Sequence, residues 1–171
     1  MAMKNLTDVY EEQLKDIYSA EKQLTEALPK MAEAASNADL KKGFKMHLQQ
    51  TQQQMQRLEQ IFKARGINPG RKKCKGMKGL IEEGNEVIEE GSKSAARDAA
   101  LIGAAQKVEH YEIATYGTLQ TYADMLGEKE QSRLLQTSLD EESQTNEQLT
   151  QLAMTINQKA QQGQKAKAGA R

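Results

Sequence analysis

One stretch of the chain, residues 102–126, carries core-type positions at spacings that alternate between three and four residues. This is the period of a helix that packs along the seam of a helical bundle. Two of these seam positions, near the middle of the stretch, are Glu109 and Glu112. A carboxylate in a bundle core is costly unless it is paired, protonated or bound to a cation. Any fold of this chain therefore has to bring partners to these two side chains.

The same alternation recurs in other parts of the chain. Long helices are predicted over residues 7–35, 39–65, 94–127 and 130–159. A connection rich in Gly and Lys follows Gly66, and the apolar residues after it predict a short helix over residues 80–90. This connection is long enough to travel the length of a bundle, whereas the other two connections are short turns. The sequence thus predicts an all-α, ferritin-like four-helix bundle with a long crossover that carries a short fifth helix.

Composition limits the number of domains, the partners and the cellular compartment. Residues 1–159 suit one domain, and residues 160–171 have no apolar anchors and are expected to form a disordered basic tail. The formal charge is balanced, so nucleic acid is not an expected partner, and no apolar run approaches the roughly 20 residues of a membrane span. The single cysteine, Cys74, allows no intrachain disulfide. Together with the lack of an apolar signal segment, this favours a cytoplasmic protein.

Each predicted long helix interrupts its seam with polar residues near its midpoint, and antiparallel helices of matched length bring their midpoints to one height. The interruptions should therefore form a single layer. Carboxylates in such a layer suit a pair of divalent metals, because they bridge two cations and neutralise charge that the core cannot solvate. The predicted ligands are Glu21, Glu109, Glu112 and Glu142. The weaker candidates are Gln50, Asn146 and His47.

Several of these residues also have a purely structural interpretation. The layer could be a metal-free hydrogen-bond network with partly protonated glutamates. His47 lies one turn from the expected metal height and is interpreted as a core or hydrogen-bonding residue, and His110 lies off the seam. The basic crossover is interpreted as a solvated charge run, and Cys74 as an incidental thiol.

Four segments carry a resemblance to a known family. They read SAEKQL (19–24), GLIEEGNEVIE (79–89), RDAALIGAAQKVEHYEIATYGTL (97–119) and LDEES (139–143). The chain resembles the YciF-type bacterial stress proteins, relatives of the ferritin and rubrerythrin group, over about residues 5–158. The resemblance implies a cytoplasmic, stress-induced homodimer with a dimetal site, and it implies no defined reaction. Apolar residues off the main seam agree with self-association, namely Leu6, Val9, Leu101 and Val108.

Two positions depart from the family pattern. Family members commonly read HLEET where this chain has HLQQT at residues 47–51, and they often carry Asp in place of Asn146. Both changes replace a charged ligand with a neutral amide, so a weaker site or a single metal is expected. One hypothesis is an iron- or manganese-binding protein that reacts with oxygen or peroxide. The alternative is a non-enzymatic dimeric stress protein with a degenerate or metal-free polar layer.

Overall fold

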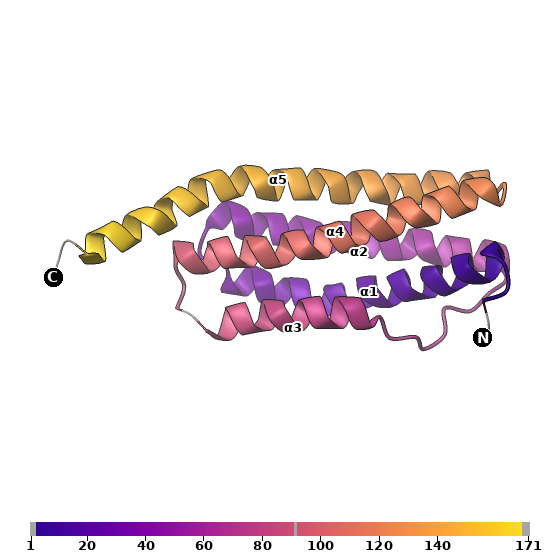
Figure 1. Cartoon of the computed structure of the whole chain (residues 1–171), viewed down its shortest axis with the longest axis horizontal. Coiled ribbons are helices and arrows are strands. Elements are labelled where there is room, and N and C mark those ends of the chain that lie inside the picture. The colour runs from indigo at the N-terminus through magenta and orange to yellow at the C-terminus, as the bar shows by residue number, and fades with distance from the viewer. Residues whose placement is uncertain (1–2, 91, 169–171) are drawn as a thin grey trace.

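The computed structural model describes residues 3–90 and 92–168, with side chains described as far as residue 162, and all of its regular structure is helical. The helices are α1 (Leu6–Ala34), α2 (Ala38–Arg65), α3 (Lys75–Glu89), α4 (Ala95–Met125) and α5 (Lys129–Ala168). Pairs α1–α2 and α4–α5 are hairpins, and α3 lies along α1 and α4 on one side of the bundle (Figure 1). The predicted bundle with a crossover helix is confirmed.

Two helix ends differ from the prediction. α3 begins at Lys75, before the predicted start at residue 80, because Cys74 caps it: its Sγ accepts a hydrogen bond from the backbone N–H of Met77. α5 continues through the predicted tail as far as Ala168 and projects beyond the other helices (Figure 1). Residues 169–171, the end of that predicted tail, lie outside the described residues.

Polar contacts hold the turn between α1 and α2 against the start of α4. The buried carboxylate of Asp98 accepts hydrogen bonds from the backbone N–H groups of Ser36, at 2.7 Å, and Asn37, at 2.8 Å. Two of the donors exposed by the break between the helices are thereby satisfied inside the protein. Both oxygens of this buried carboxylate therefore have a partner.

A second, half-buried network attaches the crossover to the bundle. Tyr111 of α4 donates a hydrogen bond to Asp16 of α1, and its hydroxyl lies 2.9 Å from Cys74 Sγ. Gly76 lets the ring come this close, because a Cβ at this position would lie 2.9 Å from Tyr111 Cε2. Cys74 therefore has a structural place in the fold, at the junction of α1, α3 and α4.

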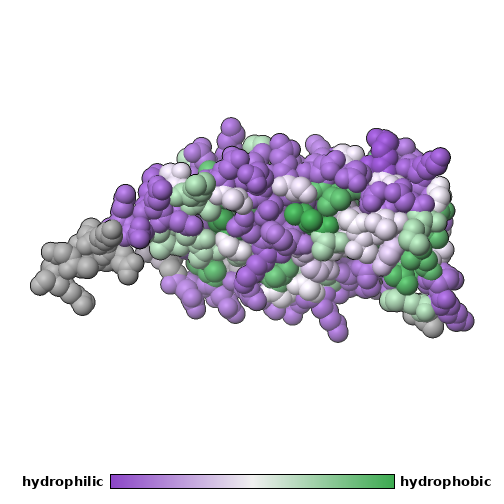
Figure 2. All heavy atoms as spheres, turned by 45° about the horizontal axis from the view of Figure 1, so that its top comes forward, coloured by the Kyte–Doolittle hydropathy of each residue, from purple (hydrophilic) through white to green (hydrophobic). Residues whose placement is uncertain are grey.

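The core runs the length of the bundle and consists of the seam residues of the four long helices together with Cys74 and Met77 of the crossover. The surface is largely hydrophilic, with apolar residues gathered in separate small patches on the face shown in Figure 2. None of the helices in the described ranges is long and apolar enough to span a membrane.

Candidate metal centre

The four predicted glutamates lie together at the centre of the bundle. Glu21 comes from α1, Glu109 and Glu112 from α4, and Glu142 from α5, and each is 0 % exposed. The three-residue spacing on α4 places two carboxylates on one face of that helix. All four side chains therefore face the interior of the bundle.

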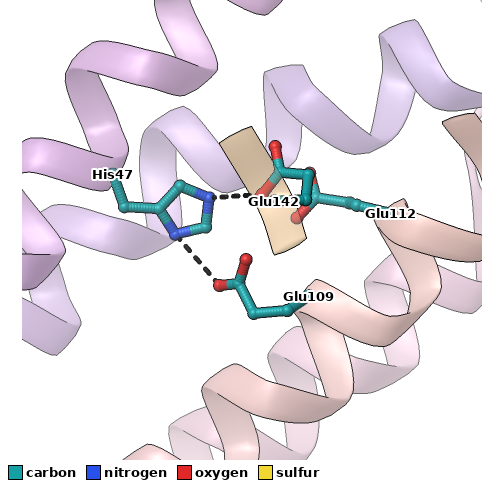
Figure 3. A group of neighbouring side chains, drawn as sticks. All are labelled: His47, Glu109, Glu112 and Glu142. Atoms are coloured by element: carbon teal, nitrogen blue, oxygen red, sulfur yellow. Dashed lines mark ion pairs between the residues drawn. The ribbon is translucent and has the colours of Figure 1, made fainter. Parts of the chain in front are cut away.

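The structure adds a fifth member, His47 of α2. One potential ligand atom from each of His47, Glu109, Glu112 and Glu142 lies within 4.8 Å of the others (Figure 3). His47 Nδ1 is 3.2 Å from Glu109 Oε1, and its Nε2 is 3.3 Å from Glu142 Oε2. The imidazole therefore stands between carboxylates of two different helices.

The prediction that His47 lies one turn away from the layer was wrong. That expectation placed the layer at the midpoint of every helix. The helix α2 starts at Ala38 and has 28 residues, so His47 lies in its first half, and the layer crosses α2 before its midpoint. Among the described residues, His47 is therefore the α2 side chain that belongs to the group of potential ligands.

Glu21 occupies the edge of the layer. It lies beside Glu112, and its Oε1 accepts a hydrogen bond from the hydroxyl of Tyr116, a fully buried residue of α4. Its Oε2 has no hydrogen-bond partner. Glu21 is thus held by α4, although it is not one of the four residues with the closest potential ligand atoms.

Burial and mutual repulsion raise the pKa values of three of these glutamates. Removal from water, followed by the charge of Glu142, raises the pKa of Glu21, Glu109 and Glu112 well above the usual range of a glutamate. Each of these carboxylates therefore gains from a proton or a cation at neutral pH.

The layer has many unsatisfied acceptors. Both oxygens of Glu109 and Glu112, one oxygen each of Glu21 and Glu142, and His47 Nε2 lack an aligned hydrogen bond. The contacts of His47 are close enough for ion pairing but are not oriented as hydrogen bonds. Buried polar groups are rarely left in this state, and carboxylate and imidazole ligands suit divalent transition metals. The donor set therefore fits a bound cation.

The two amides among the weaker candidates form hydrogen bonds to other polar side chains. Gln50 is half-buried, and its Oε1 lies 3.4 Å from Thr145 Oγ1 of α5. Asn146 accepts a hydrogen bond from Gln106 of α4, at 3.2 Å. Both amides form contacts between helices beside the layer.

Gln54, a polar residue on the predicted seam of the second helix, was not among the predicted metal ligands. Its Nε2 donates a hydrogen bond to Glu142 Oε1 and another, of 3.1 Å, to Glu141 Oε2. The available signal was its position on the α2 seam, where a polar residue 0 % exposed needs a partner.

Comparison with known proteins gives concordant results. The chain matches the family described as "Domain of unknown function (DUF892)" over residues 5–162. It is 51 % identical to the YciF protein of Escherichia coli over 163 residues, which cover 94 % of this chain and 98 % of that protein.

Solved structures agree with these sequence matches. The crystal structure of the E. coli stress protein YciF matches with a TM-score of 0.89, covering 92 % of this chain and 99 % of the other. The YcfI protein from Rhodopseudomonas palustris matches at 44 % identity with a TM-score of 0.83, covering 86 % and 94 % of the two chains.

Proposed function

Because the chain belongs to the DUF892 family together with the stress protein YciF, we propose that it is a cytoplasmic, ferritin-like stress-response protein that binds divalent metal in its core. One observation carries this proposal. Three buried glutamates and a histidine from three helices bring potential ligand atoms within 4.8 Å of one another, and most of these atoms have no other partner.

The roles of the residues follow from their contacts. His47, Glu109, Glu112 and Glu142 would hold the metal, and Glu21 extends the ligand set toward a second ion. The four carboxylates would balance the charge of two divalent cations. An iron or manganese pair bound there would supply redox chemistry toward oxygen or peroxide. The chain's own contribution is to exclude water and to orient its ligands: Tyr116 holds Glu21, and Gln54 holds Glu142.

A second candidate function also has a supporting observation. α2 contributes no carboxylate to the layer, because Gln50 replaces the glutamate of the family pattern and contacts Thr145 instead. A layer that has lost a charged ligand suits a protein that acts by dimerisation or partner binding with a degenerate or metal-free centre.

Metal analysis distinguishes the two functions. Protein purified without chelator should contain iron or manganese, and titration of metal-free protein with Mn²⁺ should saturate at a fixed stoichiometry. Glu109→Gln should reduce both values, whereas Asp98→Asn, which alters a buried carboxylate with backbone partners, should change neither. Wild-type protein that neither retains nor takes up a divalent metal would favour the second function.

We also propose that the protein is a homodimer, although two of the residues predicted to lie at its interface are not exposed. Leu101 and Val108, which were predicted to be available for self-association, are buried in the core of the single chain. Leu6 and Val9 remain half-buried at one end of the bundle, and Met125 is 72 % exposed. Sedimentation should give the mass of two chains at micromolar concentration, and a monomer alone would contradict the proposal.

A further inference from the structure

A line of polar side chains between α2 and α5 joins the carboxylate layer to the surface. Arg57 of α2 forms a bidentate pair with Glu141 of α5, with Nη2–Oε1 at 2.6 Å and Nη1–Oε2 at 2.7 Å. The amide of Gln54 then donates to Glu141 and to Glu142. One side chain thus links a carboxylate that is 20 % exposed with one that is 0 % exposed.

This connection is distinctive among the contacts of the layer. Tyr116, the donor to Glu21, is itself fully buried, and His47 contacts buried carboxylates. Within the described ranges, the Gln54 bridge is the one hydrogen-bonded path between the layer and a partly exposed carboxylate. A cation that follows this path would pass from Glu141 to Glu142 past the Gln54 amide.

Two unpartnered oxygens lie on the α2 seam that carries Gln54. Gln54 Oε1 and Thr51 Oγ1 are buried on the seam of α2 and have no hydrogen-bond partner. The terminal torsion of a glutamine is broad and roughly two-fold, so the Gln54 amide can turn over and present its oxygen in place of its NH₂ group. Amide and hydroxyl oxygens are suitable ligands for a divalent cation, and His47 lies one turn before Thr51.

Arg57 controls the outer end of this path. Its guanidinium occupies both oxygens of Glu141, and it donates a further hydrogen bond of 3.2 Å to Ser138. A cation approaching Glu141 meets this positive charge and finds the carboxylate already paired. The Arg57 side chain is 17 % exposed, so it can swing toward solvent without unfolding the helix.

We propose that Glu141 and Gln54 form the port through which a divalent cation reaches the buried layer, and that the Arg57 side chain closes this port. The inference rests on the proposed metal-binding function. It assigns to Glu141 a role in transfer, distinct from that of the ligands that hold the metal.

Kinetics of cobalt binding test the proposal, because Co²⁺ uptake can be followed by absorbance and its release can be followed in excess chelator. Arg57→Met should speed both uptake and release by about tenfold, and Glu141→Gln should slow both by a similar factor. A gate changes both rates together, so the equilibrium Kd and the stoichiometry should stay within about twofold of wild type. Arg57→Lys, which keeps the charge and loses the bidentate pair, should give intermediate rates.

A matched control is available on α5, the helix that carries Glu141. Arg133 and Glu130 of α5 also form a bidentate pair, but they are exposed and are not connected to the layer. Arg133→Met and Glu130→Gln make the same charge changes and should leave both rates unchanged.

The possible failures are distinguishable. Unchanged rates in the Arg57 and Glu141 variants, with normal cobalt binding by wild type, would overturn the port. A weaker Kd for Glu141→Gln with an unchanged uptake rate would make Glu141 a ligand and would also overturn it. Wild-type protein that binds no cobalt at equilibrium would refute the proposed function itself.

Discussion

Replacing Glu112 with glutamine should make the metal-free protein more stable and the metal-loaded protein less so. Glu112 is 0 % exposed, and neither of its oxygens has a hydrogen-bond partner. Its neighbours include the buried carboxylates of Glu142, Glu21 and Glu109. A glutamine at this position removes one acidic group and adds an NH₂ donor facing the remaining carboxylates.

The size of both effects can be worked from these contacts. A buried polar group left unsatisfied costs about 1–3 kcal/mol, and the substitution should return about this amount to the free energy of unfolding in chelator. For a chain of this length, each kcal/mol shifts the Tm by roughly 2–4 °C, so a rise of roughly 2–12 °C is expected. Metal at 1,000 times its Kd stabilises wild type by about 4.1 kcal/mol, and loss of a ligand should remove most of that gain from the variant.

Thermal unfolding in EDTA and in excess Mn²⁺ measures both effects in one experiment. Glu112→Gln should have the higher Tm in EDTA, and wild type should have the higher Tm in Mn²⁺. Asp98→Asn is the control: this carboxylate has two backbone N–H partners, so its replacement should destabilise by about 1–3 kcal/mol with or without metal. A Glu112→Gln variant that is less stable than wild type in EDTA would show that the layer is satisfied without metal.

Three further predictions concern the same layer. The free energy of unfolding of the metal-free protein should fall as the pH rises from about 4.5. The reason is that Glu109 and Glu112 have a raised pKa in the folded protein, so the unfolded chain loses these protons at lower pH than the folded chain does. A free energy of unfolding that rises with pH in EDTA would contradict this. Gln50→Glu should increase Mn²⁺ retention and raise the Tm with metal, and a lower Tm in both conditions with no metal bound would support the non-enzymatic function. Tyr116→Phe removes the donor to Glu21 and should lower the metal-free stability by about 1–3 kcal/mol in urea denaturation, and an unchanged midpoint would refute the role of this bond.

The helices and the carboxylate layer were accessible from the sequence because both depend on local periodicity. The alternation of three and four residues identifies the buried face of a helix without reference to its neighbours. A glutamate on that face must enter the core wherever the helix packs, so the burial of Glu21, Glu109, Glu112 and Glu142 could be predicted.

Residues at the edge of a helix face could not be assigned in this way. Gln50 and Asn146 contact neighbouring helices beside the layer, while Gln54, on the same helix as Gln50, bonds to Glu142. A helix turns by about 100° per residue, so a small rotation of a whole helix decides which of its flanking side chains reaches the centre.

The sequence by itself determined the bundle, the crossover and the four buried carboxylates, because these follow from the period of each helix and the lengths of the connections. Only the tertiary structure decided that His47 stands level with the carboxylates, that Leu101 and Val108 are covered within one chain, and that Gln54 connects the layer to Glu141. These features depend on the relative height and rotation of helices distant in sequence. Packing across the whole bundle determines both quantities, and no single segment encodes them.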